Sequence, residues 1–300
     1  MEARYKDFPP GWGHLKIPVS SREAALAGLA LYAPCKPIGV WAQRLAWLTT
    51  RLVGPALLPG RAQAWTPPMP ADEWDGLRLQ WSDRLGAFDK MAVYQRLQAV
   101  RPGMSLLLID GREPRAFVKV DRFGSQGLDR ERRAIECVTR FGPRSFSTPE
   151  ALCSGAHANW QYLAVRPLPA QRHRVPRRPP LDAIAADIQS ALSTLERPPG
   201  TPDHWTPMHG DLTPWNLRQL RSGDLVLLDW EDVGFSPPGA DVVLYRASAS
   251  ALTRVPAPQS DSTEAIDFWE DRVRERACSN PRDTKLAQSL LATLHGMKTA

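Results

Sequence analysis

The sequence lacks closely spaced cysteines and long apolar runs, and each absence excludes a class of protein. Its four cysteines show no C-x-x-C or Cys/His spacing, so neither a zinc site nor a dense disulfide framework is predicted. No stretch reaches about 18 uninterrupted apolar residues, which excludes a transmembrane helix. The N-terminus also lacks the basic-then-apolar order of a signal peptide, and we therefore expect a cytoplasmic protein.

The composition suits a soluble globular chain. Of 300 residues, 43% are hydrophobic and 23% are charged, a balance that supports one large or two moderate cores. Lysine and arginine number 38 against 32 acidic residues, which gives a net charge of +6. This excess favours an anionic ligand such as a nucleotide, a nucleic acid or a lipid surface, although a mildly basic solvated surface explains it equally well.

Residues 1–75 predict a helical N-terminal extension followed by a linker. Ser20 and Glu23 have capping-box spacing ahead of a first helix. A second helix contains four large apolar side chains that recur every three or four residues and share one face: Trp41, Leu45, Leu48 and Leu52. Such a face packs against its own domain or a partner subunit more often than it lies on a membrane. Docking of this extension to a partner or a membrane surface stays open.

The remaining chain divides into two predicted domains. Residues 76–165 predict a small sheet with one helix: "MSLLLID" and "RAFVKV" flank the turn "GREP" as a hairpin, "GLDRERRAIECVTRF" predicts the helix, and "NWQYLAVRPLP" predicts a further strand. Residues 166–300 predict a mainly helical domain, beginning with "PLDAIAADIQSALSTLE".

A short turn in the helical domain concentrates polar side chains. In "MHGDLTPWNL", His209, Asp211 and Asn216 stand as H-x-D-x4-N. Kinases use this spacing for an aspartate that orients or deprotonates the attacking hydroxyl and for an asparagine that holds magnesium. The spacing suits phosphoryl transfer, because that reaction depends mainly on positioning and on neutralising phosphate charge.

A predicted hairpin follows this turn. "NLRQL", the turn "RSGD" and "LVLLD" fold the chain back, which brings Asp229 near Asn216. Two oxygen ligands then converge on one hard cation, and Mg²⁺ prefers such ligands together with phosphates and water. Glu231 and Asp232 either extend this metal site or are solvated acids or a helix N-cap.

One lysine stands out upstream. Lys119 lies inside the apolar strand "AFVKV", where its ammonium needs an anionic partner. Two partners fit, namely nucleotide phosphates and a glutamate from the following helix. Glu131 is the preferred glutamate because it lies early in that helix, and Glu136 is the alternative.

Together these segments resemble the aminoglycoside phosphotransferase and choline kinase branch of the protein-kinase-like superfamily. "HGDLTPWN" resembles its "HGD-x-x-x-x-N" loop, "LLDWEDVG" its metal-binding strand, and "GADVVLY", with Asp241, the helix start that follows. The resemblance spans about residues 80–250. It departs from kinases in lacking a G-x-G-x-x-G motif ahead of "MSLLLID", where Gly86 marks the nearest glycine-bearing turn.

The resemblance implies an α+β, two-lobed protein-kinase-like fold, with a small antiparallel-sheet N-lobe, a mainly helical C-lobe and the helical extension. It implies ATP and Mg²⁺ as cofactors and a small-molecule hydroxyl as the acceptor. The implied site residues are Asp211 as catalytic base, Asn216 and Asp229 as metal ligands, and Lys119, paired with Glu131, as phosphate contact. His209 is implied to support the loop rather than to act as a base.

The sequence therefore predicts a small-molecule kinase that acts on a sugar, a glycan precursor or an amino alcohol, with no nucleic-acid partner. The basic balance counts against polycationic antibiotics as acceptors, because these require acidic surfaces. Two alternatives stay open. One is a catalytically silent kinase-like protein that binds a nucleotide or a partner, and the other is a protein kinase, against which the glycine at position 210 counts.

Overall fold

The chain folds into two compact units. A computed structural model describes residues 3–11, 13–32, 34–95, 103–253, 255–259, 262–279 and 284–298. The first unit comprises Met1–Arg132 with Pro149–His173, and the second comprises Arg133–Thr148 with Arg174–Ala300. The first contains an antiparallel sheet and the second is mainly helical, so the α+β class expected from the sequence is confirmed.

The first unit is built around one antiparallel sheet. Among the described residues its strand order is β3-β1-β2-β4-β5-β6-β8-β7. The strands are β1 (Arg4–Asp7), β2 (Leu15–Pro18), β3 (Gln63–Ala64), β4 (Lys90–Gln95), β5 (Met104–Asp110), β6 (Glu113–Arg122), β7 (Ala151–His157) and β8 (Trp160–Val165). The predicted hairpin is β5–β6, and Gly111 takes a positive φ of 56° in its turn.

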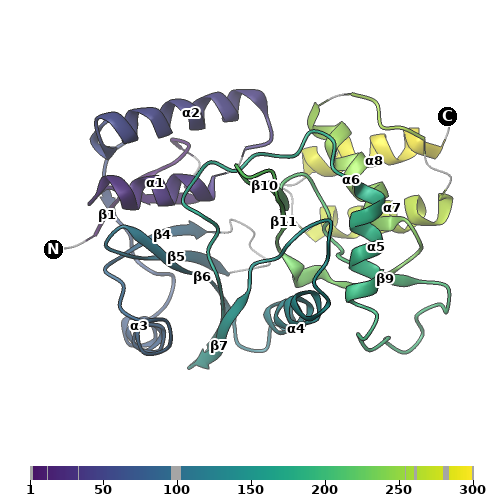
Figure 1. Ribbon diagram of the computed structural model, residues 1–300, viewed down its shortest axis with the longest axis horizontal. Coiled ribbons are helices and arrows are strands. Elements are labelled where there is room, and N and C mark those ends of the chain that lie inside the picture. The colour runs from purple at the N-terminus through teal and green to yellow at the C-terminus, as the bar shows by residue number, and fades with distance from the viewer. Residues whose placement is uncertain are drawn as a thin grey trace. The chain divides into compact units, whose positions relative to one another are not determined.

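Helices cover both faces of this sheet (Figure 1). Helix α1 (Arg22–Leu31) lies on one face and α3 (Ala71–Leu85) on the other. Leu107 of β5 packs in the cluster with α1, whereas its neighbours Leu106 and Leu108 pack in the cluster with Trp81 of α3. A strand covered on both sides needs apolar residues at successive positions, which explains the run "MSLLLID".

The N-terminal segment differs from the expected helical extension and linker. Strands β1, β2 and β3 belong to the main sheet, and β2 pairs directly with β4. Helix α1 is also part of this unit, since its small residues pack on the sheet. The structure therefore integrates this segment into the first unit. Its strands span only two to four residues, too few for a period of two to stand out in the sequence.

Helix α3 and the start of α1 differ from the sequence predictions. Helix α3 occupies a stretch that the sequence predicts to be linker up to residue 75 and strand after it. Its buried positions Trp74, Leu77 and Trp81 do have helical spacing, but "TPPMP" before them favoured an irregular segment. The N-cap of α1 is Ser21 and not Ser20, the residue that the capping-box spacing predicts. The Oγ atom of Ser21 accepts a hydrogen bond from the Ala24 amide at 3.1 Å.

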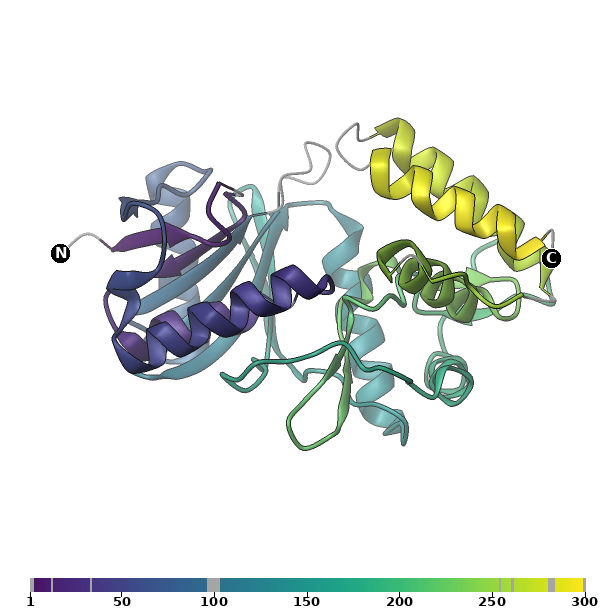
Figure 2. The ribbon, with the colours of Figure 1, turned by 90° about the horizontal axis from the view of Figure 1, so that it is seen from above.

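A second layer of helix lies over α1. Helix α2 (Pro37–Leu52) packs against α1, so that α1 lies between α2 and the sheet (Figures 1 and 2). A short 3₁₀ turn, η1 (Pro55–Leu57), follows α2. None of the described helices has the length and hydropathy of a membrane-spanning segment.

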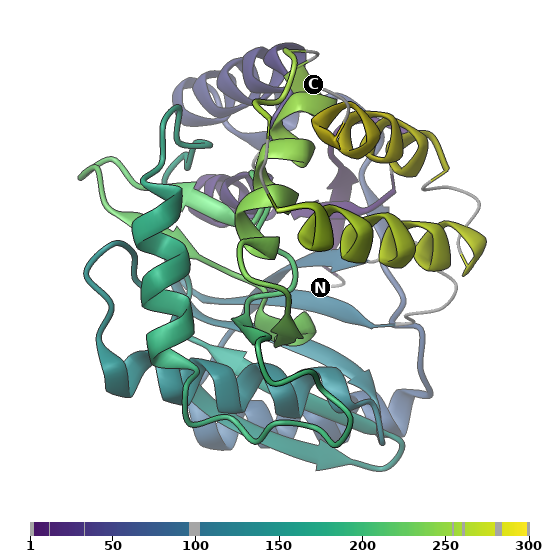
Figure 3. The same ribbon diagram turned by 90° about the vertical axis from the view of Figure 1, so that its right-hand side faces the viewer.

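The second unit consists mainly of helices. It contains α5 (Leu181–Ala191), α6 (Ala240–Thr253), α7 (Thr263–Ser279) and α8 (Thr284–Lys298). Helices α7 and α8 run side by side (Figure 3), and with α6 they enclose a core that includes Trp269 and Leu294. The predicted helix of "GLDRERRAIECVTRF" is α4 (Gln126–Phe141), which begins in the first unit and ends in the second.

Two short two-stranded sheets carry the polar segments of the second unit. Strand β9 (Thr206–Met208) pairs with β12 (Gly234–Ser236), and β10 (Leu217–Gln219) pairs with β11 (Leu225–Leu227). Between β11 and β12 lies a 3₁₀ turn, η2 (Trp230–Asp232). The loop from 209 to 216 thus starts at the end of β9 and leads into β10.

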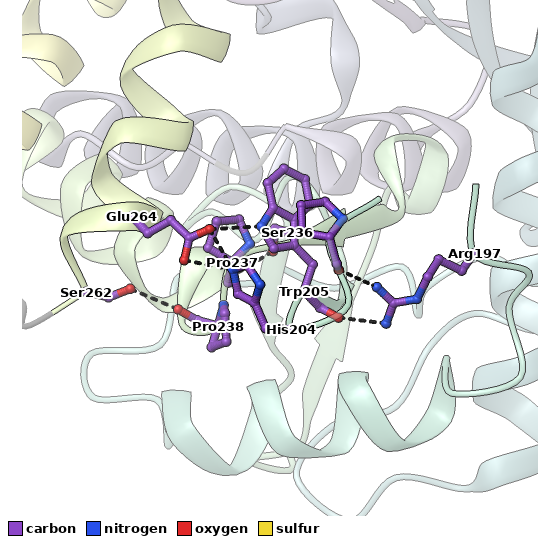
Figure 4. A network of polar contacts seen from close by, with 9 residues as sticks. Arg197, His204, Trp205, Ser236, Pro237, Pro238, Ser262 and Glu264 are labelled. Carbon is purple, nitrogen blue, oxygen red and sulfur yellow. Dashed lines mark hydrogen bonds and ion pairs between the residues drawn. The ribbon is translucent and has the colours of Figure 1, made fainter. Parts of the chain in front are cut away.

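A polar network ties the entry of β9 to α7 (Figure 4). The Nε1 group of Trp205 donates to Oε1 of Glu264 at 3.0 Å, and His204 Nε2 lies 2.8 Å from the same oxygen. Arg197 donates to the carbonyl oxygens of Pro202 at 2.6 Å and Trp205 at 2.9 Å. These contacts fix the backbone just before the polar loop.

Candidate functional site

The polar loop brings Asp211 and Asn216 into direct contact. Asn216 Nδ2 donates to Oδ2 of Asp211 at 2.7 Å and to the Asp211 carbonyl oxygen at 3.0 Å. Because the amide nitrogen faces Asp211, the amide oxygen lies on the opposite side of the group. This arrangement orients the Asp211 carboxylate and presents an oxygen ligand at Asn216.

The hairpin after the loop returns the chain to Asn216. Leu217 of β10 pairs with Leu227 of β11, and the Leu228 amide donates to the Asn216 carbonyl oxygen at 3.0 Å. Asp229 follows immediately, as the sequence pattern predicts. Its backbone has φ 68° and ψ 64°, a left-handed conformation that is costly for a residue with a side chain. Strain of this kind concentrates at functional sites.

Carboxylates crowd around Asp211. Part of the Asp211 side chain reaches solvent. The pKa of Asp211 is nevertheless raised to about 8, first by burial and then by the charges of the Asp229 and Asp232 carboxylates. The guanidinium of Arg276 and the hydrogen bond from Asn216 act in the opposite direction. A bound cation would offset the repulsion between these carboxylates.

The donor set near Asp229 fits magnesium. One carboxylate oxygen of Asp229 and one of Glu231 lie within 4.8 Å of each other. Together with the Asn216 amide oxygen they are hard oxygen donors, the type that Mg²⁺ prefers. Asp229 and Glu231 are also only partly buried, which leaves room for water and phosphate ligands.

His209 is fully buried, and both of its ring nitrogens are engaged. Nδ1 accepts the Asp211 amide hydrogen at 3.1 Å, so it carries no proton. Nε2 is then the protonated nitrogen of a neutral imidazole, and it donates to the Leu228 carbonyl oxygen at 3.0 Å. The ring also lies 4.5 Å from the Trp230 ring, measured between centroids. These contacts make His209 a structural link between the loop and the hairpin.

Asp241, in the first turn of α6, holds the backbone of the loop through two hydrogen bonds. Its Oδ2 accepts the His209 amide at 2.8 Å and its Oδ1 accepts the Gly210 amide at 3.2 Å. Burial raises the pKa of Asp241, these two hydrogen bonds and the Arg272 charge lower it, and the net pKa is about 6. The carboxylate satisfies two buried backbone donors that the loop itself cannot pair.

Gly210 occupies a position that excludes any side chain. Its φ is +81°, and a Cβ atom would lie 2.0 Å from the Asp232 carbonyl oxygen. Glycine is therefore required for the loop to approach η2. The arginine that protein kinases carry at the corresponding position of the motif would not fit here.

The first unit contains the predicted ion pair. Lys119 Nζ lies 2.7 Å from both carboxylate oxygens of Glu131, and both side chains are buried. Lys119 is in β6 and Glu131 is in the second turn of α4. The pair thus involves Glu131, the preferred of the two glutamates, and its role toward a nucleotide stays a prediction.

Sequence reasoning missed two contributors to the site. Arg276 of α7 lies 3.1 Å from Asp232 Oδ2, although 44 residues separate them in the chain. Thr148 Oγ1 accepts a hydrogen bond from Nε1 of Trp230 at 2.9 Å, across 82 residues. Neither residue belongs to a motif, so only the fold reveals them.

The comparison with protein families supports the resemblance. Residues 194–278 match the model of a family described as the phosphotransferase enzyme family. The matched range contains the polar loop, both short two-stranded sheets and α6, and the predicted resemblance to the aminoglycoside phosphotransferase branch is confirmed for it. A comparison with curated proteins gives no match.

Several solved structures are similar to the chain. One, assigned as a fructosamine-3-kinase from Haemophilus somnus 129PT, shares 9% identity over 74% of this chain and 97% of its own, with a TM-score of 0.49. A choline/ethanolamine kinase family protein from Mesorhizobium loti shares 13% identity over 76% and 95%, at 0.43. An aminoglycoside-3'-phosphotransferase of type VIII shares 16% over 74% and 98%, at 0.41. TM-scores below 0.5 assign neither a fold nor an activity to this chain.

The steric constraint at Gly210 predicts a large stability loss in Gly210→Ala. The added methyl group meets a backbone carbonyl and the positive φ adds strain, so we expect a loss of about 3 kcal/mol or more. Gly234→Ala is the matched control, because its Cβ would meet nothing closer than 3.9 Å, and it should cost about 1 kcal/mol or less. Denaturant unfolding measures both, and equal losses would contradict the assignment.

The buried Asp241 carboxyl predicts a pH-dependent difference from its amide variant. Its folded pKa of about 6 exceeds the ordinary value of 3.8, so its protonation favours folding. That contribution is complete below the unfolded pKa and is lost as pH rises through about 6. Asp241→Asn lacks the titration, so its stability deficit against wild type should shrink by about 1 kcal/mol between about pH 5 and about pH 7.5.

Urea unfolding at the two pH values measures this difference. Asp224→Asn, in the exposed turn between β10 and β11, corrects for the charge that the substitution removes. A deficit for Asp241→Asn that grows with pH would show that the carboxylate form stabilises the loop instead.

Proposed function

We propose that this protein transfers the γ-phosphoryl group of ATP, with Mg²⁺, to a hydroxyl group of a small molecule such as a sugar, a glycan precursor or an amino alcohol. The observation that supports this most directly is the loop at 209–216, in which Asn216 orients the Asp211 carboxylate beside Asp229. The match of residues 194–278 to a phosphotransferase family supports the same reaction class.

In this proposal Asp211 positions the acceptor hydroxyl and takes its proton. The hydroxyl oxygen forms a bond to the γ-phosphorus, the bond from that phosphorus to the bridging oxygen breaks, and ADP leaves with the electron pair. Burial raises the pKa of Asp211, which favours uptake of the proton. The hydrogen bond from Asn216 keeps the carboxylate in one orientation while this happens.

Other residues bind the nucleotide. Asn216 and Asp229 would hold Mg²⁺, with Glu231 as a further ligand candidate. When bound, the ion neutralises charge on the phosphates. Lys119 would contact phosphate oxygens, and Glu131 keeps its ammonium buried in a fixed place through two contacts of 2.7 Å.

The steric limit at Gly210 argues against a protein kinase. The loop of this chain has no space for the arginine of the H-R-D motif, because the Asp232 carbonyl oxygen lies where a side chain at position 210 would begin. The conjunction of Asp211, Asn216 and a strained Asp229 likewise argues against a catalytically silent protein, since strain without function would be costly to keep.

Calorimetric titration of ATP, with and without Mg²⁺, tests the metal and nucleotide site. We expect Mg²⁺-dependent binding to the wild type and at least about tenfold weaker binding to Asp229→Asn, because the substitution removes one ligand charge. Asparagine tolerates the left-handed backbone of Asp229, so the fold should persist. Asp224→Asn is the matched control and should bind as the wild type does.

A screen of hydroxyl compounds for acceptor-dependent ADP release then tests the reaction. Asp211→Asn should lower turnover of an accepted compound by about 10² or more while it leaves ATP binding within a few fold. A wild-type chain that binds no nucleotide would overturn the proposal, and so would an Asp211→Asn variant that turns over normally.

A further inference from the structure

Helix α2 exposes its large apolar side chains. Five of them are between 53% and 80% exposed and form what we call the apolar stripe: Ile38, Trp41, Leu45, Leu48 and Leu52. At 100° per residue they fall within an arc of about 80°. The sequence predicts that Trp41, Leu45, Leu48 and Leu52 share a face that packs on its own domain or on a partner subunit. In this chain the face is exposed, so the prediction of packing on its own domain is wrong.

The helix is attached to the fold through its other side. Gln43, Ala46 and Thr50 are the buried residues of α2, and Gln43 Nε2 donates to the Leu29 carbonyl oxygen of α1 at 3.2 Å. These positions lie roughly opposite the stripe around the helix. Helix α1 lies between α2 and the sheet (Figures 1 and 2). Because the buried side of α2 faces α1, the exposed stripe is directed away from the core of the first unit.

The apolar surface continues past the end of the helix. Val53 and Leu57 are 62% and 59% exposed. The turn that carries Leu57 is held firmly, because Lys6 of β1 donates to the carbonyl oxygens of Ala56 at 2.7 Å and Leu58 at 2.6 Å. Exposed apolar side chains on a fixed turn and helix form a preorganised surface.

The charged residues of the segment that contains the stripe are all positive. From residue 24 to residue 71 the sequence contains no aspartate or glutamate. The same segment carries four exposed cations, namely Lys36, Arg44, Arg51 and Arg61. The Arg44 guanidinium also lies over the Trp41 ring, 5.4 Å from its centroid. The surface therefore combines apolar side chains, a tryptophan and cations without any acid between them.

We propose that α2 docks the protein on an anionic lipid bilayer. The apolar stripe enters the boundary between headgroups and acyl chains, where tryptophan is favoured, and the cations of the segment bind lipid phosphates. A second copy of this chain suits the surface less well, since it would bring the same cations and no carboxylate to pair with them. The proposal is independent of the phosphotransferase activity.

Vesicle flotation of the full chain tests this docking. We expect binding to vesicles of phosphatidylcholine with phosphatidylglycerol, weaker binding to phosphatidylcholine alone, and a loss of binding as salt concentration rises. The combined substitution Trp41→Ser, Leu45→Ser and Leu48→Ser should lower binding at least about tenfold. Its thermal unfolding midpoint should stay near that of the wild type, because these side chains are exposed.

A matched control removes apolar side chains elsewhere. Leu79 and Phe123 are 73% and 67% exposed and lie outside α2, so Leu79→Ser with Phe123→Ser should bind vesicles as the wild type does. Arg44→Gln and Arg51→Gln should each weaken binding to the anionic vesicles about fivefold.

Three outcomes would overturn the proposal. The first is the absence of wild-type binding to anionic vesicles. The second is unchanged binding by the triple serine variant. The third is a wild-type dimer in sedimentation velocity that the triple variant converts to a monomer without any vesicle binding, which would assign the stripe to a second copy of the chain.

Discussion

The polar loop depends on one buried carboxylate. Asp241 accepts the backbone amides of His209 and Gly210, and these two hydrogen bonds fix the residues just before Asp211. His209 extends the constraint, since its ring bonds both the Asp211 amide and the Leu228 carbonyl. The loop and the hairpin that carries Asp229 are therefore held as one piece. A site that must orient two oxygen donors gains most from this kind of rigid support.

The sequence predicts the parts of the site whose partners are close in the chain. Lys119 and Glu131 are twelve residues apart, and a strand followed by a helix places them together. Asp229 reaches Asn216 through a tight hairpin, which turn chemistry predicts. Arg276 and Thr148 could not be found in this way, because their partners lie 44 and 82 residues away and no periodic pattern connects them.

The first unit shows why amphipathic patterns predict a shared face but not its orientation. Helix α2 buries a glutamine, a threonine and an alanine, whereas its leucines and its tryptophan at position 41 face outward. The buried face lies on alanine-rich α1, where small side chains allow two helices to approach closely. Hydrophobicity alone therefore assigns the wrong side to the core. The short strands β1 and β2 escaped prediction for a different reason, since four residues carry too little pattern.

The steric limit at Gly210 also restricts how this loop can change in evolution. Its Cβ position is occupied by a carbonyl oxygen of the backbone, which no change of side chain can move. A lineage that acquired an arginine here would first have to displace η2 and the acidic residues it carries. Descent from this loop to an arginine-bearing one therefore cannot proceed by a substitution at position 210 alone, because the backbone of η2 would have to move as well.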